Sequence, residues 1–240
     1  MKKDLTINGA STYHSYPDDG GKHPGLIVLE EIWGVNAHVK SVADRFAAEG
    51  YSVLSPELLP AGLLELMTPQ IQKDLFDPEK RNEVQPVLRA AMQPIQQPEY
   101  AANAIATLKA CVDYLMNDSG VNGSIAVVGF CFGGTYSFHL AANDARVKAA
   151  VPFYGHAPAS EELAKITCPV LAFYGDQDHG LMPGLPALKE EMAKLGKDFE
   201  AVVYPGVGHA FFNDTNAHAY SAEVAKDAWE KTLAFFAAHL

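Results

Sequence analysis

The chain has 240 residues, of which 48% are hydrophobic and 20% are charged, a composition ordinary for one globular domain with a single core. Its formal net charge of −11 argues against nucleic acid or an anionic membrane as the main partner, because no basic stripe is available to neutralise phosphates. No apolar run is long enough to span a bilayer. The N-terminus MKKDLTINGA lacks the apolar stretch of a secretory signal. Three cysteines indicate reduced thiols, so we expect a cytoplasmic location.

The first predicted element is a strand over 25–34, GLIVLEEIWG, an apolar run that ends in polar residues, as is typical of a buried parallel strand that reaches a functional edge. A helix is predicted over 36–50, with an asparagine to cap its start and a glycine to end it. A second strand follows over 51–59. Residues 60–98 are rich in Pro and Gln and are predicted to form loops and short helices, which favours a lid or pocket wall.

The later elements continue this alternation. Helices are predicted over 99–117, 135–144, 185–195 and 220–239, and strands over 124–130, 147–155, 169–176 and 199–206. Alternating strands and helices predict one α/β domain over 1–240, in which helices cover both faces of a mostly parallel sheet. Reactive groups in such a sheet lie in loops beyond the carboxyl ends of the strands.

The stretch VVGFCFGG, residues 127–134, places a cysteine between glycines after a run of apolar residues. Gly129, Cys131 and Gly133 occupy the positions of the G-x-S-x-G nucleophile elbow, with cysteine in place of serine. The elbow needs small residues on both sides because its central residue is held in a strained turn. The start of the following helix favours a thiolate at Cys131. The alternative is a buried small hydrophobe in a glycine-rich turn.

A nucleophile also needs a base and a group that orients the base. In this arrangement they follow in the order nucleophile, acid, histidine, each after a later strand. GDQDH supplies Asp176 and Asp178 after one strand, and His209 follows the next. We expect Asp178 to be the acid, because Asp176 lies closer to the strand end and could instead shape the turn. His179 is interpreted as a pocket-wall or solvated residue.

The remaining histidines and cysteines lack such placement. His139, inside a predicted helix, is expected to be structural, whereas His156 follows a strand and could line the pocket. Cys111 and Cys168 are expected to be core residues. None of the Cys and His spacings forms a zinc set.

Two glutamates end the first apolar strand, where carboxylates are costly unless they are paired or solvated. Glu30 is expected to be exposed. Glu31 lies near the loop that normally supplies one N–H of an oxyanion hole, and it could contact Cys131 itself.

In combination these residues resemble the dienelactone hydrolase family, a thiol branch of the α/β-hydrolase superfamily. The resemblance extends from about Gly25 to the C-terminal helix and rests on EIWGVN, GFCFGG, GDQDH and GHAF in the family's order. It implies an α/β-hydrolase fold with Cys131 as the nucleophile, His209 as its base and Asp178 as the acid.

The resemblance also implies roles for residues around that triad. Glu31 would hold the resting thiol, and the backbone N–H groups of Ile32 and Phe132 would form the oxyanion hole. Trp33 and Tyr154 match aromatic positions that line the family's pocket. The implied reaction is hydrolysis of a small-molecule lactone or carboxylic ester through an acyl-thioenzyme, with no metal or organic cofactor.

The chain departs from the family's substrate site. Members that bind dienelactone have an arginine a few residues after the catalytic histidine, where this chain has Phe212 and Asn213. Arg81 or Arg89 could match a second arginine of the family, or could be a solvated surface residue. Loss of a bidentate carboxylate clamp weakens selection for an anionic lactone, so a neutral ester or lactone is an alternative substrate.

Other functions remain open at this point. A general carboxylesterase or thioesterase would use the same triad. A redox-reactive thiol at Cys131 and a ligand-binding module without turnover are the alternatives from other classes.

Overall fold

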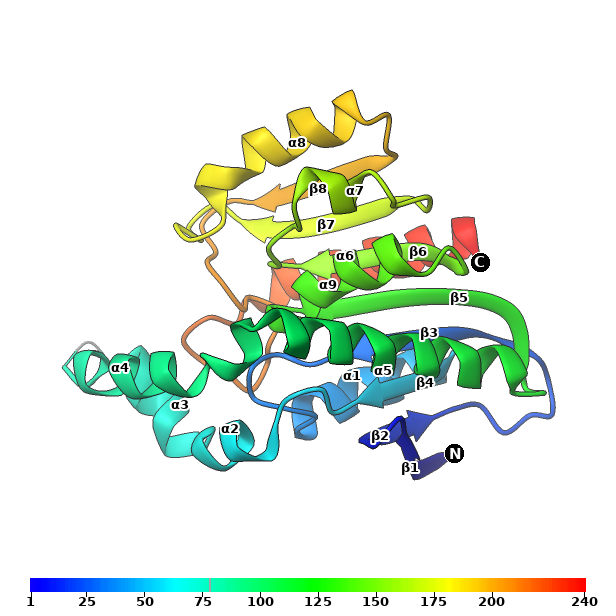
Figure 1. The fold of residues 1–240 in the computed structure, drawn as a ribbon, viewed down its shortest axis with the longest axis horizontal. Coiled ribbons are helices and arrows are strands. Elements are labelled where there is room, and N and C mark those ends of the chain that lie inside the picture. Colours follow the sequence, from blue (N-terminus) through cyan, green and yellow to red (C-terminus); the bar gives the residue numbers. More distant parts are fainter. Residues whose placement is uncertain (78) are drawn as a thin grey trace.

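A twisted sheet of eight strands runs through the protein, in the order β1-β2-β4-β3-β5-β6-β7-β8 (Figure 1). The computed structural model describes residues 1–77 and 79–240, so residue 78, inside the predicted 60–98 excursion, lies outside the described residues. The strands are β1 Lys2–Ile7, β2 Ala10–Ser15, β3 His23–Leu29, β4 Ser52–Pro56, β5 Val121–Phe130, β6 Val147–Phe153, β7 Val170–Gly175 and β8 Phe199–Tyr204. The six strands from β3 to β8 are parallel to one another, and β2 pairs antiparallel with both of its neighbours, β1 and β4.

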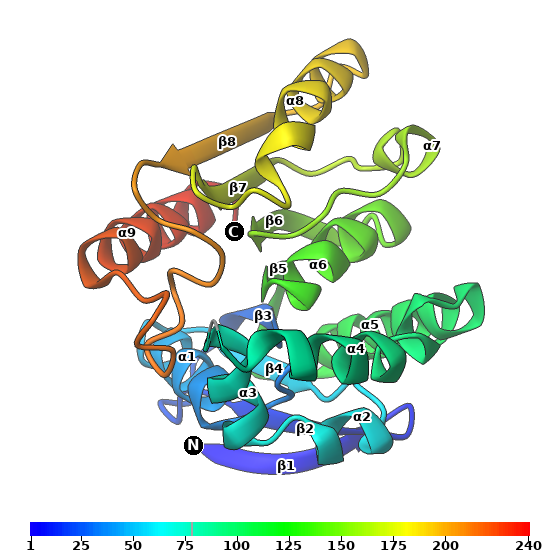
Figure 2. The same cartoon turned by 90° about the vertical axis from the view of Figure 1, so that its left-hand side faces the viewer.

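Helices cover both faces of this sheet, as the alternating pattern predicts. They are α1 Ala37–Ala48, α2 Ala61–Leu66, α3 Pro69–Phe76, α4 Arg81–Ala91, α5 Pro98–Asn117, α6 Phe132–Asn143, α7 Ser160–Leu163, α8 Leu185–Lys194 and α9 Ala222–His239, with short 3-10 turns η1 Pro94–Gln96 and η2 Met182–Gly184. Helices α1 and α9 lie on one face and α5, α6 and α8 on the other (Figure 2). On the first face, the rings of Phe46 and Trp229 pack with their centroids 4.2 Å apart.

The N-terminal hairpin of β1 and β2 is absent from the sequence prediction. Its turn is Asn8-Gly9, in which both residues have positive φ, 49° and 81°. An Asn-Gly pair between two strands is a strong hairpin signal, since both residues tolerate this conformation. The sequence therefore contained a local signal for this element.

The predicted 60–98 excursion forms short helices with a small core of its own. Helices α2, α3, α4 and turn η1, here called the lid, extend beyond the carboxyl ends of the strands (Figure 1). Their buried cluster consists of Leu59, Leu63, Met67, Val84, Leu88 and Ile95. Trp33 and Phe132, which flank the predicted catalytic loops, pack against this cluster. The lid is thus joined to the edge of the sheet where reactive groups are expected.

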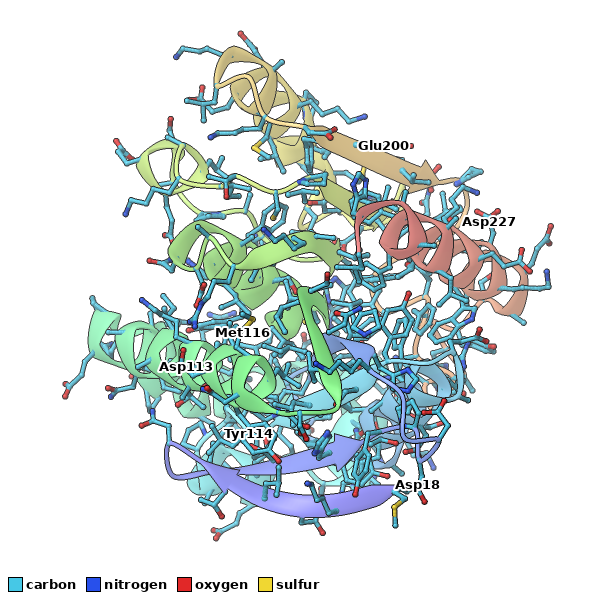
Figure 3. All side chains as sticks on the ribbon, turned by 90° about the vertical axis from the view of Figure 1, so that its right-hand side faces the viewer. Asp18, Asp113, Tyr114, Met116, Glu200 and Asp227 are labelled. Carbon is cyan, nitrogen blue, oxygen red and sulfur yellow. The ribbon has the colours of Figure 1, made fainter. Side chains whose placement is uncertain are left out.

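Exposed acidic side chains lie on the side of the molecule away from the lid (Figure 3). They include Asp18 in the loop after β2, Asp113 on α5 and Glu200 on β8. Among the residues that the structure describes, no helix combines the length and apolar character needed to cross a membrane.

Candidate active site

A cavity of about 360 Å³ lies beside Cys131, at the carboxyl ends of the parallel strands. Its walls come from the loop after β3, the turn between β5 and α6, the loop after β8, and lid helices α3 and α4. The lining residues are Glu31, Ile32, Trp33, Leu75, Arg81, Cys131, His209, Ala210 and Asn216. The fold therefore brings five of the predicted site residues and one candidate arginine around one space.

Cys131 occupies a sharp turn between β5 and α6. Its φ of 55° and ψ of −110° are strained for a residue with a side chain, and its N–H donates to the Phe153 carbonyl at 3.0 Å. A Cβ on Gly129 would lie 2.1 Å from the Gly133 carbonyl oxygen, and a Cβ on Gly133 would lie 2.5 Å from the Leu29 carbonyl oxygen. The glycines are needed because backbones approach closely on both sides of the cysteine. This geometry supports the elbow over a plain buried turn.

His209 and Asp178 form a hydrogen-bonded pair next to the thiol. His209 Nδ1 lies 2.6 Å from Asp178 Oδ2, and the side chain of Asp178 is 7% exposed whereas that of His209 is 43% exposed. Burial tends to lower the pKa of His209, but the Cys131 sulfur and Asp178 together raise this pKa well above its ordinary value. Burial tends to raise the pKa of Asp178, but the hydrogen bond and charge of His209 give a net lowering. The pair favours a protonated imidazole beside a carboxylate.

Asp176, the other candidate acid, points elsewhere. Its Oδ1 accepts hydrogen bonds from the Gly206 N–H at 2.8 Å and from the Gln177 amide at 2.9 Å. Asp176 therefore joins the ends of β7 and β8, as expected for a residue that shapes the turn. The structure brings Asp178, and not Asp176, to His209.

Glu31 is buried and held by two residues that sequence reasoning did not connect with it. The Tyr154 hydroxyl donates to Glu31 Oε1 at 3.1 Å, and the Asn213 amide donates to Glu31 Oε2 at 2.5 Å. These two donors fix the orientation of the Glu31 carboxylate, and its role of holding the resting thiol stays a prediction. Cys131 interacts with His209.

Tyr154 lies beneath the cavity rather than in its lining. It is 1% exposed, its φ is 38°, and its ring centroid is 5.0 Å from that of His209. Burial, followed by Glu31 and Cys131, raises its pKa well above the ordinary value, so the hydroxyl remains a hydrogen-bond donor. Tyr154 supports both Glu31 and His209 from below.

Comparison with known proteins identifies the family of this chain. The sequence model of the dienelactone hydrolase family matches residues 10–240. The chain belongs to the dienelactone hydrolase family. A Saccharolobus solfataricus protein named "Putative carboxymethylenebutenolidase" is 33% identical, with 88% of this chain and 87% of that protein covered.

Solved structures give the same result for the fold. The crystal structure of a "Putative Dienelactone Hydrolase" from Klebsiella pneumoniae is similar to this chain with a TM-score of 0.81 and 26% identity, covering 99% of this chain and 98% of that one. A dienelactone hydrolase structure from Anabaena variabilis, at 18% identity and TM-score 0.67, covers 100% of this chain and 98% of that one and shares the fold. The predicted α/β-hydrolase fold is confirmed.

In this family member, the two candidate arginines have different positions. Arg81 begins α4 and lines the cavity of Cys131. With the Gln85 amide oxygen turned toward it, Arg81 Nε donates to that oxygen at 2.8 Å. Arg89, two turns later on α4, is exposed like Arg81 but lies outside the lining. Phe212 and Asn213, where the family has an arginine, are both buried.

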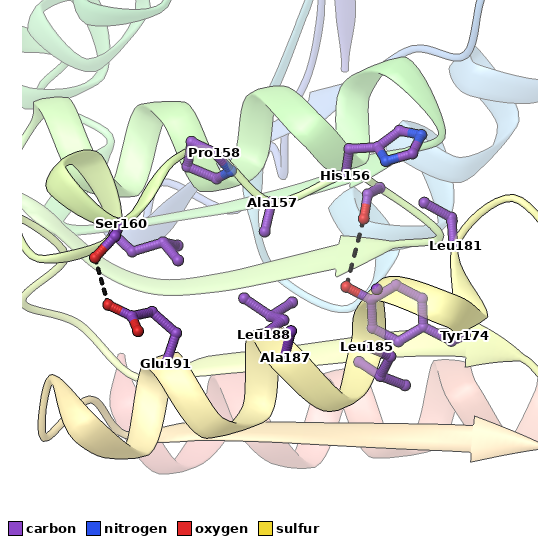
Figure 4. Close-up of a pocket in the computed structure, with 13 residues that line it drawn as sticks. His156, Ala157, Pro158, Ser160, Tyr174, Leu181, Leu185, Ala187, Leu188 and Glu191 are labelled. Carbon is purple, nitrogen blue, oxygen red and sulfur yellow. Dashed lines mark hydrogen bonds between the residues drawn. The ribbon is translucent and has the colours of Figure 1, made fainter.

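The other histidines and cysteines lie outside this cavity. His156 lines a separate cavity of about 290 Å³ between the loop after β6 and α8 (Figure 4), and His139 Nδ1 pairs with Glu162 at 2.7 Å. Burial raises the pKa of Cys111 to about 12 and that of Cys168 to about 11. Within the described part of the chain, no cluster of three or more His, Cys, Asp or Glu side chains is arranged to hold a metal ion.

The close packing at the elbow predicts opposite effects for two glycine substitutions. Gly133→Ala is expected to lower the free energy of unfolding by about 3 kcal/mol, because the added methyl group meets backbone atoms that cannot move aside. Gly62→Ala in α2, where nothing lies within 4 Å of the added Cβ, is expected to raise it by about 0.4–1 kcal/mol. Urea unfolding curves of both variants measure the difference. Equal effects would contradict this account of the elbow.

The hydrogen bond between Asp178 and His209 predicts that Asp178, and not Asp176, influences the pKa of His209. Asp178→Asn is expected to lower the pKa of His209, because the imidazolium loses its carboxylate partner. Asp176→Asn is the matched control and should leave that pKa unchanged. An NMR titration of the His209 ring protons measures both. A shift in the Asp176 variant alone would exclude Asp178 as the orienting acid.

Proposed function

We propose that this chain is a thiol-dependent hydrolase that cleaves a small lactone or carboxylic ester with Cys131, His209 and Asp178. One observation carries the proposal: the strained turn presents Cys131 to a cavity that it shares with His209, whose Nδ1 is 2.6 Å from Asp178. A nucleophile, a base and a group that orients the base are the parts that acyl transfer requires. Family membership supports the same chemistry.

The reaction begins with attack of the Cys131 thiolate on the substrate carbonyl carbon. Phe132 is the first residue of α6, and the first N–H groups of a helix lack intrahelical acceptors. Its N–H and that of Ile32, in the loop after β3, form the oxyanion hole that stabilises the tetrahedral intermediate. Gly133 N–H does not contribute, since it donates to the Glu30 carbonyl at 2.9 Å.

Collapse of this intermediate breaks the ester C–O bond and leaves an acyl group on sulfur. Protonated His209 donates its proton to the departing oxygen, which in a lactone remains attached to the acyl chain. Neutral His209 then removes a proton from water, the resulting hydroxide attacks the thioester, and the free acid departs as Cys131 regains its thiolate. Asp178 holds the imidazole in the required orientation throughout.

Arg81 is the group that we assign to an anionic substituent of the substrate. It supplies a guanidinium to the wall of the Cys131 cavity. Phe212, in contrast, is buried in the core, and Asn213 is buried and donates to Glu31. A guanidinium binds carboxylates in a planar, bidentate manner. An anionic lactone is therefore favoured over a neutral ester, with the carboxylate held from the lid instead of from the loop after His209.

The nucleophile is tested with a panel of cis- and trans-dienelactone, aryl esters and acyl thioesters. Cys131→Ala is expected to lower kcat/KM at least about 10³-fold on every hydrolysed compound, because covalent catalysis is lost. Cys168→Ala is the control, since that thiol is buried. Full activity of the Cys131 variant would overturn the mechanism. Turnover confined to thioesters or aryl esters would instead identify a thioesterase or general carboxylesterase.

The role of Arg81 predicts a selective effect on charged substrates. Arg81→Gln is expected to raise KM about tenfold for a lactone that carries a carboxylate, the loss of one charged hydrogen bond, and to leave neutral aryl esters unaffected. Arg89→Gln, on the same helix but outside the cavity lining, is the matched control. Steady-state kinetics with both substrate types measures the difference, and equal KM changes for charged and neutral substrates would contradict the assignment.

A further inference from the structure

Two glutamates outside the catalytic triad meet beneath the loop after β3. Glu30 is 0% exposed, and its Oε1 accepts hydrogen bonds from the N–H groups of Leu58 at 2.8 Å and Leu59 at 3.1 Å. Glu57 Oε2 accepts from the Val35 N–H at 2.9 Å. The expectation that Glu30 is exposed is wrong, because the strand ends inside the protein and the lid connection covers it.

Each of these carboxyl groups has one oxygen that lacks a donor. Glu30 Oε2 and Glu57 Oε1 are both buried, and no group in the described part of the chain donates a hydrogen bond to either. Two ionised carboxylates in this position would repel each other and leave two buried acceptors unsatisfied. One proton on Glu30 removes both problems, since a carboxylic acid donates to a neighbouring carboxylate. Burial, followed by the interaction with Glu57, raises the pKa of Glu30 well above its ordinary value.

The pair connects three parts of the active site. The Glu30 carbonyl accepts the Gly133 N–H, two residues after Cys131, at 2.9 Å. Glu57 contacts the cavity loop, because a Cβ on Gly34 would lie 3.1 Å from Glu57 Oε2, and the same Cβ would lie 2.6 Å from Leu64 of the lid. The cavity loop, the elbow and the base of the lid therefore meet at these two glutamates, the elbow through the backbone carbonyl of Glu30.

We propose that Glu30 and Glu57 are positioning residues that share one proton and thereby hold the loop of Ile32 in place between the thiol and the lid. The shared proton stands independently of the reaction. Its catalytic consequence rests on the proposed function, because Ile32 N–H is one donor of the proposed oxyanion hole. Neither carboxyl group touches the substrate cavity.

The titratable groups around the pair agree with a proton on Glu30. Tyr100 on α5 interacts with both carboxyl groups, while Lys40 on α1 and Asp4 and Tyr13 on the N-terminal hairpin line a small cavity together with Glu57. Tyr100 donates its hydroxyl to the Leu58 carbonyl at 2.9 Å, and burial, its largest influence, raises its pKa so that it stays neutral. Lys40 and Glu57 line the same small cavity, so the ammonium group of Lys40 lies closer to Glu57, the member of the pair that is ionised when Glu30 holds the proton.

The proton on Glu30 makes the unfolding free energy depend on pH, and this dependence can be measured without a substrate. The unfolded chain loses this proton near the ordinary glutamate pKa of about 4.3, whereas the folded protein keeps it to higher pH. The stabilisation is therefore complete below the unfolded-state pKa and is lost as the pH rises through the raised folded-state pKa. Across that interval the folded state binds one more proton than the unfolded state at this site.

The test measures unfolding free energy against pH, from about pH 5 to pH 9, for Glu30→Gln, Glu57→Gln and the double variant. In Glu30→Gln the amide oxygen accepts from Leu58 and Leu59 while its NH₂ donates to Glu57, so the variant is expected to fold. It is also expected to lose the one-proton decline, which is the fall in unfolding free energy with rising pH that the release of one proton from the folded protein causes. Its kcat/KM near neutral pH should stay within about twofold of the unmodified chain, and its activity should extend to higher pH. Glu57→Gln supplies the donor from the other side and should also abolish the decline.

The double variant is the decisive comparison. Its two NH₂ groups face each other without an acceptor, so it is expected to be less stable than either single variant. It should also have a kcat at least about tenfold lower with little change in KM, as expected for displaced catalytic groups.

The proposal is overturned if Glu30→Gln keeps the one-proton decline, if the double variant is as stable as the singles, or if neither single variant folds. If Glu30→Gln alone fails to fold, Glu57→Gln must still abolish the decline. A protein that shows these stability changes but hydrolyses nothing in the substrate panel would refute the proposed function and leave the shared proton in place.

Discussion

The close approach of backbones around Cys131 is the constraint on which the active site depends. Gly129 and Gly133 allow β5, β3 and α6 to come together at distances that no side chain permits, and Cys131 takes the strained conformation that results. Strain of this kind persists only where the surrounding structure holds it. Here the central parallel strands, all deeply buried, supply that support. The thiol is consequently presented at the carboxyl edge of the sheet, next to the start of a helix.

Two groups of polar side chains surround the thiol of Cys131. His209 interacts with Cys131 directly, and Asp178 pairs with His209 on the other side of the imidazole ring. Tyr154 and Asn213 lie below and hold Glu31 by both carboxylate oxygens. A buried carboxylate with two donors is tolerated because its desolvation is offset by charge-assisted hydrogen bonds. The side chain of Glu31 is therefore fixed in position by Tyr154 and Asn213.

The lid is part of the same construction. Its small apolar core contacts Trp33 and Phe132, and its base is attached to the sheet through Glu30 and the N–H groups of Leu58 and Leu59. Arg81 enters the cavity from this direction. The cavity beside Cys131 is thus lined by residues from the sheet loops on one side and from the lid on the other.

Features that depend on a few neighbouring residues were readable in the sequence: the alternation of strands and helices, the glycines around Cys131, and the succession of Asp178 and His209 after later strands. Backbone sterics and side-chain periodicity act over short distances along the chain, so they leave local patterns. The Asn8-Gly9 hairpin was equally local, although the prediction did not include it. Partners far apart in sequence were decided only by tertiary packing. Glu31 meets Tyr154 and Asn213 across 123 and 182 positions, and Glu30 meets Glu57 inside the protein, because burial and hydrogen bonding act on whichever groups the folded sheet and lid bring together.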